Sequence, residues 1–161
     1  MKSVVSLMWG VFLALGVGLL TIFGIIWPLF MTFFDTELAW SRVLAAVVLV
    51  LAIAFSFYWG GMGSSYRAPS RRRLHGTLVA PVAFMISPVL NFSTGQGFFP
   101  GLNSIWTVGG VVGVLVLSTV AAYIGARRGE SLYAHNRKYI QRRNRKKPER
   151  DRERRQRQEE G

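Results

Sequence analysis

Four long apolar runs, separated by short polar or glycine-rich connections, make up most of the chain before residue 126. A helix needs roughly 20 apolar residues to cross the core of a bilayer. Each run therefore predicts a membrane-spanning helix, although the third is the shortest and the most interrupted. The expected fold class is all-α, a polytopic transmembrane bundle of four helices that covers residues 4–34, 38–61, 76–92 and 105–126.

A basic, polar segment follows the last apolar run, and no bilayer core could hold it. The chain thus divides into a four-helix transmembrane domain, 1–126, and a basic C-terminal cytoplasmic tail, 127–161. Pro148 divides the tail, because nine Lys/Arg and one acid precede it, whereas five Arg and five acids follow it. We expect the second half to be a solvated helix or disordered, since it is highly polar and carries no net charge.

The first half of the tail has the composition of a helix that lies in the membrane interface. Its four apolar or aromatic residues from Leu132 to Ile140 fall on one helical face, with basic residues around it. Three partners fit this half: anionic lipid headgroups, nucleic acid such as ribosomal RNA near the membrane, and an acidic protein. The residues expected to bind anionic lipid or nucleic acid are Arg127, Arg128, Arg137, Lys138, Arg142, Arg143, Arg145, Lys146 and Lys147.

The distribution of charge predicts the orientation of the helices. The formal net charge is +12, although half of the residues are hydrophobic. Short loops rich in Lys/Arg stay in the cytoplasm, which places both termini on the cytoplasmic side of the membrane. Nineteen of the twenty Lys/Arg then lie on the cytoplasmic side. The loop that fixes this topology contains no acid and four arginines, Arg67, Arg71, Arg72 and Arg73.

Two features of the first half of the chain have alternative interpretations. Lys2 and the apolar run after it resemble a secretory signal peptide. The run continues far beyond the roughly 7–15 apolar residues that such peptides contain, which favours an uncleaved first helix. We expect Pro28 to kink or end this helix.

Arg42 is more suited to reaching the headgroups or pairing with a nearby acid than to binding a substrate anion.

Small residues at four-residue spacing predict where the helices pack. Lipid provides no hydrophobic drive between helices, so close contact at small side chains holds the bundle together. The partner of each small-residue stripe is either a neighbouring helix or a second copy of the chain, and Gly109 with Gly113 suits a homodimer. Gly60, Gly61 and Gly63 are expected to end the second helix. The packing residues are Gly10, Ala14, Gly18, Ala52, Ser56, Gly60, Gly76, Ala80, Ala83, Ser87, Gly109 and Gly113.

The sequence lacks the residue sets that enzymes and ion-coupled carriers use. It has no cysteine, no metal-ligand spacing around its two histidines, no paired carboxylates and no phosphate-binding glycine loop. No charged residue lies deep in an apolar run, which argues against a proton-coupled carrier. We therefore expect no enzyme activity, no cofactor and no metal. Pro81, Pro88 and Asn91 are a candidate intramembrane polar site, although a proline kink with Asn91 near the outer headgroups is the simpler explanation.

The end of the second run and the loop after it resemble a known group of proteins. Residues 58–79 read YWGGMGSSYRAPSRRRLHGTLV, and the matching residues are Gly60, Gly61, Arg67, His75 and Gly76. This stretch, about a seventh of the chain, resembles the YrzE-like group of small bacterial four-helix membrane proteins. The resemblance implies the four-helix architecture and a bacterial origin, and hence a location in the bacterial inner (plasma) membrane. It implies no activity. Pro81 and the long basic tail depart from the pattern of the group.

Together these features predict a non-catalytic integral membrane protein, structural or accessory in role, whose basic tail engages anionic lipid. One alternative is a membrane protein that tethers ribosomes or nucleic acid. Another is a small transport component that works as an oligomer or with partner chains. The expected partners are a bilayer with anionic headgroups and, beyond it, a larger membrane complex or a second copy of the chain, with nucleic acid less favoured.

Overall fold

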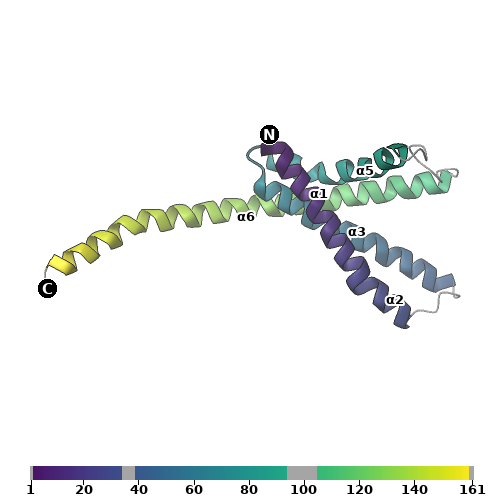
Figure 1. Ribbon diagram of the computed structural model, residues 1–161, viewed down its shortest axis with the longest axis horizontal. Coiled ribbons are helices and arrows are strands. Elements are labelled where there is room, and N and C mark those ends of the chain that lie inside the picture. The colour runs from purple at the N-terminus through teal and green to yellow at the C-terminus, as the bar shows by residue number, and fades with distance from the viewer. Residues whose placement is uncertain (1, 34–38, 94–104, 160–161) are drawn as a thin grey trace. The chain divides into compact units, whose positions relative to one another are not determined.

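Helices account for all of the secondary structure in the part of the chain that the computed structural model describes, residues 2–33, 39–93 and 105–159 (Figure 1). This confirms the all-α class that the sequence predicts. In chain order, the elements are α1 (Lys2–Thr21), the π-helical turn η1 (Ile22–Ile26), α2 (Trp27–Phe33), α3 (Ala39–Arg67), α4 (Arg72–Thr77), α5 (Val79–Ser93) and α6 (Ile105–Glu159).

Within the described ranges, three helical stretches are long and apolar enough to cross a membrane, and they indicate a multi-pass integral membrane protein. These stretches are Ser3–Phe30, Val43–Arg67 and Val108–Tyr139. By contrast, α5 has 15 residues, which at about 1.5 Å per residue gives a length of about 22 Å. The hydrocarbon core is roughly 30 Å thick, so the fourth span stays a prediction.

Pro28 alters the first helix without ending it. Proline has no N–H, and its ring clashes with the carbonyl group four residues earlier, which here belongs to Gly24. The chain widens into a π-turn just before the proline, where the Trp27 N–H donates to the carbonyl oxygen of Ile22, five residues earlier. The helix then continues to Phe33. Of the two expected effects of Pro28, a kink or an end, the structure therefore excludes the end.

A second proline divides the third apolar run. Because Pro81 has no N–H, the carbonyl group of Thr77 lacks its usual helical donor. The helix breaks there, with Leu78 between α4 and α5, and regular bonding resumes where the Val82 N–H donates to Leu78 O at 3.1 Å. The single helix expected at 76–92 is therefore two helices, α4 and α5. The first of them begins at Arg72, within the arginine-rich loop that predicts the topology.

The glycines of α3 lie inside the helix, so the prediction that they end it is wrong. The helix continues to Arg67. At Gly60, a Cβ would lie only 2.7 Å from the Gly10 carbonyl oxygen and from the Ala14 Cβ of α1. At Gly61, it would lie 2.2 Å from the carbonyl oxygen of Ala122 in α6. The glycines that look like a stop signal therefore allow close helix contacts.

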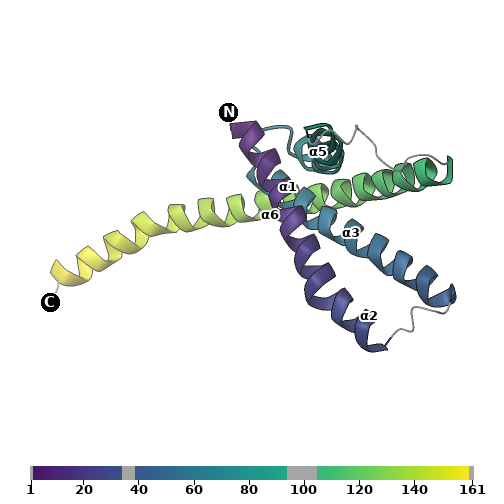
Figure 2. The ribbon, with the colours of Figure 1, turned by 45° about the vertical axis from the view of Figure 1, so that its right-hand side comes forward.

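Small side chains line the contact between α1 and α3, which lie side by side in both ribbon views (Figures 1 and 2). A Cβ at Gly10 would lie 2.5 Å from the Ser64 Cβ, and one at Gly18 would lie 3.2 Å from the Ser56 Oγ. Ser56 donates its hydroxyl to the carbonyl oxygen of Ala52, one turn earlier, at 2.7 Å. The structure thus brings the stripe of α1 against the stripe of α3, as is typical of helix pairs in lipid.

The core of the bundle is small, and the surface around it is apolar. Its buried hydrophobic residues come from α1, α3, α5 and α6, and the rings of Phe57 and Phe84 pack at 5.8 Å between centroids. Large side chains lie outside, with Phe12 72% and Leu20 74% exposed. Small residues are thus buried and large apolar side chains are exposed, the reverse of a water-soluble protein. This arrangement is expected where lipid covers the outer face. The buried core residues are Val11, Ala14, Phe57, Val79, Ala80 and Ala122.

The chain divides into two compact units, Met1–Glu130 and Ser131–Gly161. The boundary expected from hydropathy lies at residue 126, and the first unit extends one helical turn beyond it. Within the second unit, α6 remains helical through Pro148 to Glu159. Pro148 thus does not interrupt the helix.

Replacing Gly60 with alanine should destabilise the bundle. Its new Cβ would meet backbone and side-chain atoms of α1 at 2.7 Å, and overpacking of this kind typically costs about 1–3 kcal/mol. Gly16 is the matched control, because nothing lies within 4 Å of its Cβ position. Gly16→Ala should leave the thermal unfolding midpoint in detergent unchanged or raise it, since alanine favours helix over glycine by about 1 kcal/mol. Equal midpoints for both variants would contradict the close contact.

Candidate functional site

The C-terminal part of α3 crosses α6 at backbone contact distance. A Cβ at Gly125 would lie 1.9 Å from the Tyr58 carbonyl oxygen, and one at Gly129 would lie 2.3 Å from the Met62 carbonyl oxygen. Both pairs are four residues apart on their helices, so two successive turns of α6 meet two successive turns of α3. Only glycine fits at these two positions of α6.

A buried hydrogen bond fixes this crossing and draws α4 into it. The Ser65 hydroxyl donates to the carbonyl oxygen of Ala126 at 2.7 Å. From the other side, Gly76 of α4 approaches closely, since a Cβ there would lie 2.4 Å from the Ala126 Cβ and 2.6 Å from the Gly61 carbonyl oxygen. The last turns of α3, the short α4 and the middle of α6 therefore meet at one point.

Arg67, the first of the loop arginines (Arg67, Arg71, Arg72 and Arg73), stacks on an aromatic ring. Its guanidinium carbon lies 3.9 Å from the centroid of the Trp9 ring of α1. A cation over the face of tryptophan is attracted by the ring quadrupole. The contact ties the last turn of α3 to the first turns of α1.

Arg72 closes the end of α3. Its Nη1 donates to the carbonyl oxygens of Tyr66 at 2.7 Å and Ser65 at 3.2 Å. The last carbonyl groups of a helix have no partner within it, and a basic side chain at that end satisfies them and complements the helix dipole. Arg72 thus acts as a cap on the helix that precedes it.

Arg73 pairs with Glu130, which joins α4 to α6. The Arg73 Nε donates to the Glu130 carboxylate, and this hydrogen bond, followed by the charge of the carboxylate, raises the pKa of Arg73. Arginine is already charged at physiological pH, so the shift adds no pH switch. Both side chains are solvent-exposed, and a pair of this kind contributes more to geometry than to stability.

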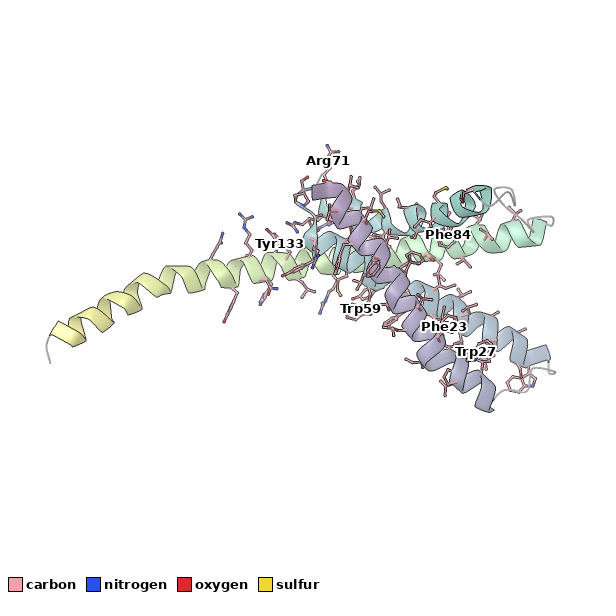
Figure 3. All side chains as sticks on the ribbon, viewed as in Figure 1. Phe23, Trp27, Trp59, Arg71, Phe84 and Tyr133 are labelled. Carbon is pink, nitrogen blue, oxygen red and sulfur yellow. The ribbon has the colours of Figure 1, made fainter. Side chains whose placement is uncertain are left out.

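Arg71 differs from the other loop arginines in both backbone and side chain. Its φ of 42° and ψ of 45° place it in the left-handed region, where a non-glycine residue is uncommon. The His75 N–H donates to its carbonyl oxygen at 3.2 Å, but its exposed guanidinium has no bonding partner within the described ranges. Figure 3 shows Arg71 directed away from the helices.

The tail bases occur in both units. Arg127 and Arg128 lie in the first unit, Arg137 and Lys138 lie in the second, and all four side chains are exposed on α6. The remaining tail bases, Arg142, Arg143, Arg145, Lys146 and Lys147, lie on the helical backbone of α6, with side chains outside the described part.

The candidate intramembrane polar site stays a prediction. Pro81 lies in the first turn of α5, whereas the side chains of Pro88 and Asn91 are outside the described part. Nothing lies within 4 Å of the Cβ positions of Gly109 and Gly113, so no other described residue packs on them. Within the described ranges, no group of three His, Asp or Glu side chains could hold a metal ion.

Comparisons with protein-family models, with curated proteins and with solved structures found no match to this chain. The resemblance to the YrzE-like group therefore stays a prediction. The site that the structure does show is the junction of α1, α3, α4 and α6, where Arg67, Arg72 and Arg73 are each held in a different way. In the sequence, the four-residue spacing of Gly125 and Gly129 is the signal for the close contact between α3 and α6. It is easily overlooked, because two arginines lie between these glycines.

Cross-linking can test the junction directly, because the chain has no cysteine of its own. The double variant Arg73→Cys/Glu130→Cys should react with a short bis-maleimide, since these side chains are in contact. The control, Arg73→Cys/Arg128→Cys, moves the second thiol to another face of α6 and should react more slowly. Peptide mass spectrometry would identify the product, and equal yields for both pairs would rule out the observed packing of α4 on α6.

Proposed function

We propose that this chain is a non-catalytic structural or accessory protein of a bacterial plasma membrane, whose basic tail binds anionic lipid headgroups. The observation that carries the proposal is the continuity of α6. One helix contains the apolar stretch that qualifies as a span and all nine tail bases, and the four tail bases whose side chains are described are exposed. A cationic segment that leaves the bilayer within the same helix begins at the membrane surface, where anionic lipid attracts each base by about 1 kcal/mol before screening.

Exposed apolar side chains support binding along the membrane surface. In the second unit, Leu132 and Tyr139 are exposed on the face that the sequence predicts to be apolar, and Arg137 and Lys138 lie beside it. Tyrosine favours the interface between headgroups and acyl chains. This mixture fits a lipid surface better than it fits RNA, for which the charges alone would be enough.

The proposal includes four spans with both termini in the cytoplasm. α5 is short, and a short span is accommodated by local thinning of the bilayer or by flanking side chains that reach the headgroups. Within the first unit, the loop arginines lie at or after the end of α3 that crosses α6, and Arg127 and Arg128 lie between the two glycines of that crossing. The positive-inside tendency then places that end in the cytoplasm.

Neutralising the tail should abolish retention on anionic lipid. Replacement of all nine tail bases with glutamine should weaken retention of the detergent-solubilised protein on immobilised phosphatidylglycerol by at least about 100-fold, given about 1 kcal/mol per base before screening. In the control, glutamine replaces all ten charged residues after Pro148, which leaves the net charge unchanged, and retention should persist. Unchanged retention of the first variant would refute the lipid proposal. Stronger displacement by RNA than by anionic lipid would favour the nucleic-acid alternative.

Single-cysteine labelling tests the proposed orientation. With an impermeant thiol reagent added to intact cells, Ser93→Cys should be labelled, because the end of α5 is proposed to lie outside. Ile140→Cys, in the tail, should be labelled only after the membrane is permeabilised. Labelling of position 140 in intact cells would contradict a cytoplasmic C-terminus.

A further inference from the structure

An exposed apolar stripe runs from α5 into α4 and shows how far the hydrocarbon extends. Leu74 is 51% exposed, Leu78 40% and Met85 58%. These residues are spaced by four and seven, so they share one helical face, and the break at Leu78 does not interrupt it. The opposite face is buried at Gly76, Val79 and Ala80. Lipid is the solvent that suits such a stripe, so acyl chains reach Leu74, one turn from Arg71.

Trp9 on α1 marks the same boundary independently. Tryptophan concentrates at the level of the lipid headgroups, and the Trp9 ring is partly exposed beneath the guanidinium of Arg67. Two helices that are distant in sequence therefore place the edge of the hydrocarbon at the loop arginines. In a bilayer with this boundary, charged groups at the same depth would meet headgroup phosphates.

Within the described ranges, no acidic side chain pairs with Arg71 at this boundary. Glu130 is the one acidic residue between positions 38 and 148, and it pairs with Arg73. Arg67 lies over an aromatic ring, which does not neutralise its charge. Arg71 combines an exposed guanidinium with a backbone conformation that would favour glycine over arginine. An anion would supply the partner that Arg71 lacks among the described residues.

We propose that Arg71 binds the phosphate of one anionic lipid headgroup, with the acyl chains of that lipid on Leu74 and Leu78. The planar guanidinium fits a phosphate with two parallel hydrogen bonds. The apolar stripe favours a lipid over free phosphate or RNA, because only a lipid satisfies both the charge and the exposed leucines. The site lies in the first unit and does not depend on the tail, although it rests on the proposed membrane location.

Native mass spectrometry of the full chain in mild detergent tests this site by titration with phosphatidylglycerol. The first bound lipid should saturate at one per chain, and phosphatidylcholine should bind much more weakly. In Arg71→Gln, the apparent affinity for that first lipid should fall at least about fivefold. Arg157→Gln is the matched control, because it removes one charge from the charge-balanced end of the chain, outside the nine tail bases, and it should leave the first lipid in place.

Arg71→Gly separates lipid binding from folding. Glycine relieves the left-handed strain, so the thermal midpoint should stay the same or rise while the lipid is lost. Equal losses in Arg71→Gln and Arg157→Gln, equal binding of both lipids, or displacement of the lipid by inorganic phosphate at matched ionic strength would each overturn the site. The variant with nine tail bases replaced should still retain the first lipid, so failure of the tail proposal and failure of this site give different results.

Discussion

The close approach of helix backbones at glycine is the constraint on which the bundle depends. Gly60 and Gly61 are neighbours in sequence but point about 100° apart around α3. The first therefore meets α1, and the second meets α6. A pair of adjacent glycines makes α3 the central helix, because it brings two different backbones within contact distance. In lipid, where hydrophobic burial gives no advantage to one apolar neighbour over another, this contact is the main source of specificity.

The positions of the charged residues follow from that contact. Because α3 and α6 meet at Gly125 and Gly129, Ser65 reaches the Ala126 carbonyl group and α4 turns back onto α6. Arg73 then lies beside Glu130, although the two are far apart in sequence. The loop arginines thus become four residues with different roles, namely a ring contact, a helix cap, an ion pair and an exposed cation. Charge counting treats all four as equivalent.

Hydrophobic periodicity predicts the helices but not how they end. The all-α class and the long apolar stretches follow from the residues themselves, as does the small-residue stripe of α1. The glycines of α3 are misread as a stop signal, because glycine is equally suited to a helix end and to a close contact, and only the partner helix distinguishes them. Gly125 and Gly129 are missed for a related reason, since the arginines between them suggest solvent. The left-handed backbone of Arg71 has no signal in the sequence at all.

The π-turn before Pro28 also affects every residue after it. A π-turn holds one residue more than the α-helical turn it replaces, so the faces of α2 are rotated by about 100° from those of an unbroken helix. Trp27 therefore occupies the direction that residue 26 would otherwise take. The turn behaves as a single inserted residue absorbed within the helix. A one-residue deletion inside Ile22–Ile26 would return the faces of α2 to the directions that they have in an unbroken α-helix. The same deletion within α1 would instead rotate the residues of α1 before the deletion relative to those after it.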